Sequence, residues 1–146
     1  MEVMVSERSP TAAEYVDLRA RMGWGTIDEE TAVKTIEAAA FTVCLRDNGR
    51  LIGLARVMGD SVMYFFLADL IVDSEFRGGG LGDRLMREVT AYFDRSAKPG
   101  ATITLIPVRG GESFYERYGF VRCPDGPFGP GMHYATAPGP KSPAGM

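Results

Sequence analysis

The sequence contains few of the residues that carry metal and redox chemistry, with one histidine and two cysteines among 146 residues. Cys44 and Cys123 stand singly, so they form neither a disulfide framework nor a zinc-ligand spacing. The single histidine, His133, gives little support to a histidine-based catalytic triad or to a metal centre. We therefore expect no metal site and a reducing compartment, with the cytoplasm as the expected location.

Long apolar runs and an excess of basic residues are also missing. No run approaches the ~18 apolar residues that a membrane span requires, and the acidic N-terminal stretch MEVMVSERSP does not read as a signal peptide. The 16 Lys and Arg against 19 Asp and Glu give a net charge of −3, which argues against nucleic-acid binding. We expect no nucleic acid and no membrane as partner, so an anionic ligand would need a local site of basic side chains or backbone amides.

What remains is an ordinary globular composition, 45% hydrophobic and 24% charged. At this length we expect one domain over residues 1–137. The end of the chain is rich in Pro, Gly and Ala, so we expect residues 138–146 to form a disordered tail.

Hydrophobic periodicity predicts an α/β (α+β) fold, with a mixed, mostly antiparallel central sheet flanked by helices. The first helix is expected to be capped by Ser9. The predicted elements are helices at 9–22 and 28–40, a hairpin from residue 41 that turns at Asn48–Gly49, a strand at 61–73, a helix from 81 to about 97, a strand at 102–108, a short helix within 111–120 and a last strand at 132–136. The strand at 61–73, the helix after it and the strand at 102–108 make one βαβ unit, so we expect this strand pair to be parallel.

The stretch FRGGGLGDRLM, residues 76–86, joins a buried strand to the start of a helix. Glycines at such a turn let backbone N–H groups converge on a ligand at the positive end of the helix dipole, a geometry that binds phosphate. A Walker A loop is excluded because Asp83 and Arg84 follow Gly82, where Lys and Ser or Thr are required. The dinucleotide fingerprint is excluded because its third glycine falls on Asp83.

The remaining pattern, Arg77-x-x-Gly80-x-Gly82, resembles the pyrophosphate loop of the GNAT superfamily of acyl-CoA-dependent N-acetyltransferases. LADLIVDSEFRGGGLGDRLM resembles the central strand, turn and helix of that family, and LIGLARV resembles the strand before it. SFYERYGF resembles the second family motif, Phe-Tyr-x-x-x-Gly-Phe. The resemblance covers roughly residues 41–122, with both motifs in the family order, and implies a GNAT-like sheet with a βαβ cofactor-binding core.

The resemblance implies acetyl-CoA as the cofactor. Backbone groups of Leu70, Ile71 and Val72 would pair with its pantetheine arm, in a wedge that opens between this strand and the next, near Pro107. The pyrophosphate would lie against the backbone amides of Arg77, Gly78, Gly79, Gly80, Leu81, Gly82 and Asp83.

Two residues are candidates for the chemistry. Tyr115 matches the family tyrosine that lies near the sulfur, where it would act as the acid for the thiolate leaving group; the alternative is an aromatic packing role. Asp69 would be costly to bury unpaired within FFLADLIV, so it is a candidate for base or amine anchor, with a hydrogen bond to a loop amide as the alternative. The Glu that many family members carry before this Asp is Ala68 here, which weakens the case for a direct carboxylate base.

Other positions are less specific. Trp24 lies in a loop that walls the acceptor site in this family, so it is a candidate for substrate binding, with core packing as the alternative. Arg77 is expected to fix the loop, while Arg84 and Arg117 are candidates for phosphate contacts or solvated surface residues. Where family members often have an Asn, this chain reads VRGGES, so that cofactor contact is lost or replaced.

These observations predict a GNAT-type N-acetyltransferase that transfers an acetyl group from acetyl-CoA to a primary amine by direct attack in a ternary complex. The expected acceptor is a small-molecule amine, and a homodimer is possible for such a fold. The alternatives are a protein lysine or N-terminal acetyltransferase, which would act on a peptide amine, and a non-catalytic acyl-CoA-binding regulatory module.

Overall fold

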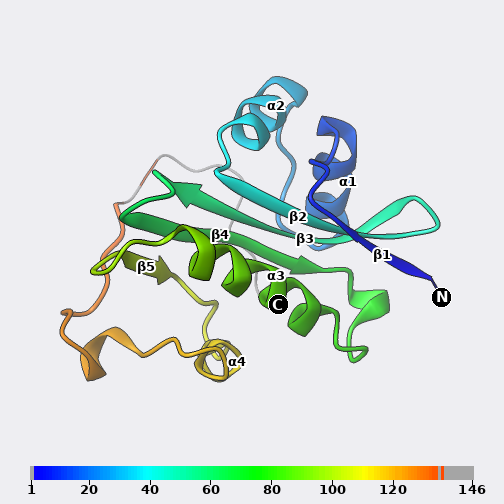
Figure 1. The fold of residues 1–146 in the computed structure, drawn as a ribbon. Helices are drawn as coiled ribbons and strands as arrows, with labels where there is room; N and C mark the ends of the chain where they lie inside the picture. The colour runs from blue at the N-terminus through cyan, green and yellow to red at the C-terminus, as the bar shows by residue number, and fades with distance from the viewer. Residues whose placement is uncertain (1, 135, 137–146) are drawn as a thin grey trace.

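The computed structural model describes residues 2–134 and 136. It contains a five-stranded sheet in the order β1-β2-β3-β4-β5 (Figure 1). The first four strands are antiparallel to their neighbours and β4 is parallel to β5, which confirms the mixed, mostly antiparallel fold. The elements are β1 (Val3–Ser6), α1 (Ala12–Arg21), α2 (Glu29–Glu37), β2 (Phe41–Asp47), β3 (Arg50–Gly59), β4 (Tyr64–Val72), the short 3-10 helix η1 (Ser74–Phe76), α3 (Leu81–Ser96), β5 (Thr102–Leu105), α4 (Glu112–Glu116) and the 3-10 helix η2 (Cys123–Asp125).

Helices cover the two faces of the sheet. α1 and α2 lie together on one face and α3 crosses the other (Figure 1). Side chains alternate between these faces along β2: Val43 and Leu45 pack toward the α3 side, whereas Cys44 packs among the residues of α1 and α2. The central strands are therefore buried on both faces, which explains their nearly continuous apolar sequence.

Several boundaries differ from the predictions. The strand β1 was not predicted, and the cap of α1 is Thr11 rather than Ser9, because Thr11 and Glu14 form a reciprocal capping box. The last predicted strand is wrong for residues 132–134 and 136, which are not in a strand, and Ala135 lies outside the described residues. The predicted tail at 138–146 also lies outside them.

Two irregularities in β4 shape the molecule near its centre. The β3–β4 pairing shifts so that Arg56 faces Asp69 while Val57 faces Leu67, which leaves Ala68 as an extra residue in a bulge. The parallel ladder with β5 ends at the pair Leu67–Leu105, although β4 continues to Val72. The two strands therefore part at the bulge, close to the position expected for the wedge.

Among the described residues, no helix has the length and apolar character to cross a membrane.

Candidate active site

The N-terminus of α3 has no side-chain cap. Its N-cap residue is Gly80, which adopts a left-handed conformation with φ of 77°. α1 and α2 differ in this respect, because the side chains of Thr11 and Asp28 accept hydrogen bonds from their first turns. The first N–H groups of α3 are thus left without a cap at the positive end of the dipole of a 16-residue helix. Such a helix end favours an anion.

A cleft of ≈ 640 Å³ opens at this end of α3. The turn before α3 forms one wall, and the segment between β5 and α4, with Gly110 and Gly111, forms another. We call it the glycine cleft; its lining consists of Val72, Phe76, Arg77, Gly78, Gly80, Leu81, Gly82, Asp83, Val108, Arg109, Gly110, Gly111, Phe114 and Tyr115.

The glycine cleft brings together most of the residues predicted to hold the cofactor. The predicted residues in its lining are Val72, Arg77, Gly78, Gly80, Leu81, Gly82, Asp83 and Tyr115. Gly79 lies in the same turn without lining the cleft, and Leu70 and Ile71 precede it, buried in β4. Asp69 and Trp24 are not part of this lining.

The Asp83 carboxylate in the lining of the glycine cleft is paired with a cationic side chain, Arg117. Asp83 is the only acidic residue of the lining, and its Oδ1 accepts hydrogen bonds from Arg117 Nη2 at 2.6 Å and from the Tyr118 hydroxyl. Arg77 donates from Nε to the Val72 carbonyl oxygen at 3.3 Å, which agrees with its expected role in fixing the turn. The lining therefore offers two arginines, Arg77 and Arg109, and no carboxylate without a cationic partner.

Arg109 is a residue that sequence reasoning did not place in the site. It lies in the VRGGES segment, where the loss of a family Asn was noted, and it lines the cleft opposite the turn of α3. The signal in the sequence was the glycine pair Gly110–Gly111 before a short helix. The same pattern, glycines followed by a helix, occurs at the turn before α3. Gly110 has a φ of 88°, so this segment also depends on a left-handed glycine.

Tyr115, on α4, is a buried residue in the lining of the glycine cleft. Only 6% of its surface is exposed, and its ring packs against Phe114 and Phe120 with centroid distances of 5.1 and 6.1 Å. This burial raises the pKa of Tyr115 to about 12. The hydroxyl therefore keeps its proton at neutral pH and can serve as a hydrogen-bond donor.

Asp69 and Trp24 lie on the α1 and α2 side of the sheet. Asp69 Oδ2 accepts hydrogen bonds from Arg56 Nε at 2.6 Å and from the Tyr15 hydroxyl at 2.7 Å. These donors are side chains on β3 and α1, not the loop amide considered from the sequence. Trp24 is 4% exposed and belongs to the apolar cluster between α1, α2 and the sheet, so the structure favours core packing for it.

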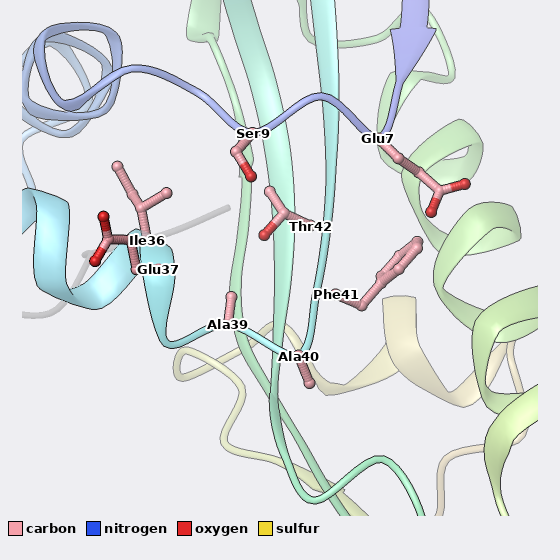
Figure 2. A pocket seen from close by; sticks show the side chains of 8 residues that line it. All are labelled: Glu7, Ser9, Ile36, Glu37, Ala39, Ala40, Phe41 and Thr42. Atoms are coloured by element: carbon pink, nitrogen blue, oxygen red, sulfur yellow. The ribbon is translucent and has the colours of Figure 1, made fainter.

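A second hollow of ≈ 350 Å³ lies at the opposite edge of the sheet, between the segment before α1, the end of α2 and the start of β2 (Figure 2). Its lining includes the carboxylates of Glu7 and Glu37 and the hydroxyls of Ser9 and Thr42. No residue predicted for cofactor or substrate lines it. The glycine cleft, by contrast, is lined by eight of the residues predicted to bind the cofactor.

Comparison with known protein families gives a match over most of the chain. The family model described as "Acetyltransferase (GNAT) domain" matches residues 12–129, which include the whole sheet except β1 and the complete glycine cleft. The chain belongs to the GNAT acetyltransferase family. This membership places it among the acetyltransferases, a family that uses acyl-CoA as the acyl donor.

Individual GNAT relatives agree with this assignment. A Staphylococcus aureus protein of unknown function, described as "Probable Acetyltransferase", is 30% identical, with a TM-score of 0.82, over 92% of this chain and 100% of its own. "Uncharacterized N-acetyltransferase ycf52" of Pyropia yezoensis is 33% identical over 79 residues, which are 54% of this chain and 44% of that protein. The chain thus spans less than half the length of this curated relative.

One solved GNAT structure carries a ligand in its description. Arabidopsis thaliana Naa50, in complex with the bisubstrate analogue CoA-Ac-MVNAL, superposes with a TM-score of 0.65 over 82% of this chain and 83% of its own. Its sequence is 19% identical, so it shows a shared fold and no more.

Proposed function

We propose that this GNAT enzyme transfers the acetyl group of acetyl-CoA to the amine of a small molecule by direct attack in a ternary complex. The observation that carries the proposal is the uncapped N-terminus of α3, which lines the same cleft as the buried Tyr115. One end of this cleft suits a pyrophosphate and the other suits the leaving group of an acyl transfer.

The residues around the wedge suit an extended pantetheine arm. Leu70, Ile71 and Val72 pair with β3 on one side but have no β5 partner on the other. Their outward backbone groups would pair with the amides of the arm, while the amides of the turn from Arg77 to Asp83 would bind the pyrophosphate. Arg109, on the opposite wall, would add a charge-assisted contact to a phosphate in place of the family Asn.

Acetyl-CoA supplies an activated thioester. The protein then has to stabilise the negative charge that develops on the thioester oxygen and to bind the acceptor amine in its neutral form. A backbone N–H at the parted end of β4, near Ala68, would donate to the developing oxyanion. The acceptor amine has an ordinary pKa of ~10.4 and must lose a proton before it attacks. Since the carboxylate of Asp83 is bound by Arg117, we propose that solvent takes this proton.

Tyr115 would stabilise the leaving sulfur mainly as a hydrogen-bond donor. Its pKa of about 12 lies well above that of an ordinary thiol, about 8.5, so complete transfer of the phenolic proton to the thiolate is uphill. A donor held in a buried site still stabilises the charge that develops on sulfur. Removal of the hydroxyl should therefore lower kcat more than it changes cofactor binding.

A cysteine-linked acyl intermediate has little support. Cys44 is fully buried in the sheet, where burial raises its pKa to about 11, and a thiol in that state is a poor nucleophile. Cys123 lies in η2, and neither cysteine lines the glycine cleft. Direct attack by the amine does not require a nucleophilic cysteine in the cleft.

The acceptor would approach the wedge over a partly apolar face. Tyr64, Phe66 and Ile106 are 64%, 38% and 70% exposed, and Phe66 and Ile106 flank the last paired residues of β4 and β5. This face suits the apolar body of a small amine. Its openness also favours the second candidate, a lysine or N-terminal amine of a peptide, which is the class of acceptor named in the Naa50 analogue.

The test is a thiol-release assay on the complete chain with acetyl-CoA and a panel of small amines and peptides. Release of free thiol that depends on one acceptor class, together with mass detection of the acetylated product, would support that class. Tyr115→Phe should lower kcat by ~10²-fold and change the Kd for acetyl-CoA by less than about 3-fold. Equal turnover of Tyr115→Phe and the unchanged enzyme would limit Tyr115 to packing.

A further inference from the structure

Three buried polar side chains form a network at the centre of the sheet. Tyr15, Arg56 and Asp69 are 1%, 5% and 6% exposed, and both of the others donate to Asp69 Oδ2. The Arg56 guanidinium lies 5.2 Å from the centre of the Tyr15 ring. We call these three residues the Asp69 network.

The network joins four elements of the fold. Asp69 is on β4, Arg56 on β3 and Tyr15 on α1. Arg56 Nη1 also donates to the carbonyl oxygen of Thr35 in α2, at 2.7 Å. The two helices that cover one face of the sheet are thus bonded, through one arginine and one carboxylate, to a single position on β4.

That position is where β4 becomes irregular. Asp69 directly follows the bulged residue Ala68 in β4, and its cross-strand partner is Arg56 of β3. Leu67, on the other side of the bulge, is the last residue of β4 that pairs with β5. A bulge inserts an unpaired residue, disrupts the ladder locally and bends the strand around it. The ion pair links β3 and β4 directly beside this bend, next to the wedge.

A contribution to stability alone does not explain why the Arg56–Asp69 ion pair is buried here. Burying two charges costs desolvation that their attraction often fails to repay, and well-packed apolar residues in their place are frequently as stable. The same chain provides a comparison, because Arg46 on β2 is equally buried, at 5%, and is bonded to Glu14 of α1 through two hydrogen bonds of 3.1 Å. That second pair also ties α1 to the sheet and itself stands beside a bulge, at Ile52 of β3, but Arg46 on β2 lies two strands away from the bulge at Ala68 of β4.

We propose that Arg56 and Asp69, supported by Tyr15, are positioning residues for acetyl transfer: they hold the bulge at Ala68, and with it the backbone that faces the thioester, in register with the α1 and α2 layer. The proposal rests on the proposed function for the identity of the reaction. It replaces the expectation that Asp69 is the base, because the carboxylate lies outside the cleft lining and is engaged by two donors. Asp69 acts through the strand and does not touch the reacting atoms.

The test compares Arg56→Lys with the matched control Arg46→Lys. Lysine keeps each positive charge but cannot reach both partners as the guanidinium does. We expect both variants to lose stability, while only Arg56→Lys lowers kcat per folded molecule, by at least 10-fold, with the KM for acetyl-CoA within 2-fold. Similar kcat values for the two variants would overturn the proposal, since Arg56 would then matter for folding alone.

A second pair of measurements separates positioning from base catalysis. Tyr15→Phe removes one donor and leaves the ion pair, so it keeps the protein folded, whereas Asp69→Asn leaves Arg56 buried without its counter-charge. We expect both to lower kcat without changing the shape of its pH profile. If either variant abolishes the acidic limb of that profile, Asp69 is a base and the positioning role is wrong.

Hydrogen exchange of backbone amides tests whether the Asp69 network holds the bulge without any measurement of acetyl transfer. The amides of residues 66–70 should exchange at least 10-fold faster in Arg56→Lys than in Arg46→Lys at equal global stability. If the unchanged enzyme releases no thiol with any acceptor, the proposed function fails, and this comparison still decides whether the network holds the bulge. Equal exchange in the two variants would overturn the inference.

Discussion

Gly82 in the first turn of α3 lies against the ring of Phe114 on α4, so closely that a Cβ added to the glycine would meet ring carbon Cζ at 3.3 Å. Both residues line the glycine cleft. The absence of a side chain at Gly82 thus lets the first turn of α3 lie closely against the Phe114 ring of α4.

Gly82→Ala should destabilise the protein by about 1 kcal/mol. Alanine gains ~1 kcal/mol over glycine within a helix, but overpacking against Phe114 costs ~1–3 kcal/mol. In a Phe114→Leu background the crowding is relieved, so the same substitution should become stabilising by about 0.5–1 kcal/mol. Urea unfolding of the four proteins measures this double-mutant cycle, and an effect of the same sign in both backgrounds would contradict the packing argument.

Gly80 allows a direct test of the phosphate assignment. Its φ is 77° and an added Cβ would meet nothing within 4 Å, so a side chain there is limited by backbone strain and not by space. Gly80→Asp and Gly80→Asn share this strain and have nearly the same shape, but only Asp adds a negative charge. We expect both to lose ~1–2 kcal/mol of stability. Calorimetry should give a Kd for acetyl-CoA at least ~10-fold weaker for Asp than for Asn; equal values would remove the pyrophosphate from this turn.

Arg117 and Asp83 provide an electrostatic test of the same end of the cleft. Asp83 would repel a phosphate if Arg117 did not hold its Oδ1 at 2.6 Å. Arg117→Gln should therefore weaken acetyl-CoA binding by ~3–10-fold, most strongly at low salt, where exposed charges are least screened. Asp83→Asn should restore the affinity when it is added to Arg117→Gln. A double variant as weak as the single one would mean that Arg117 contacts the phosphates itself.

The glycine turn and its helix were predictable because their signals are local. The glycine run and the spacing of Leu81, Leu85, Val89 and Phe93 each determine structure within a few residues, and all four apolar residues are buried as expected. The capping box at Thr11 was equally readable, since its Glu14 follows at the required spacing, but the prediction placed the cap at Ser9.

The hydrogen-bond partners of Asp69 were not predictable because they are distant in the sequence. Asp69 is 13 residues from Arg56 and 54 from Tyr15. They meet only because the β3–β4 register contains a bulge, and a register shift by one residue would place the carboxylate on the other face. The position of Arg109 across the cleft from the turn before α3 likewise depends on contacts between segments that are distant in the sequence. The strand β1 was missed for a related reason, since its four residues pair with β2 some forty residues later.

Stability should fall at alkaline pH earlier than for a protein without a buried thiol. Burial raises the pKa of Cys44 from 9.0 to about 11, although the nearby Arg46 opposes this and Glu14 adds to it. Burial and the charge of Asp69 raise the pKa of Tyr15 from 10.0 to about 12. In each case the folded protein favours the neutral form. Below pH 9 that stabilisation is complete, and it is lost as pH rises toward 11 for Cys44 and toward 12 for Tyr15.

Urea unfolding from pH 8 to pH 11 should show this onset. The free energy of unfolding should begin to fall near pH 9, with a slope of at most about 1.4 kcal/mol per pH unit for one group. Cys44→Ala removes the thiol and should move the onset to about pH 10, where the buried tyrosines take over. Val43→Ala is the matched control, because Val43 is also 0% exposed and its truncation lowers stability without removing a titrating group. An onset near pH 9 that persists in Cys44→Ala would show that another group controls alkaline unfolding.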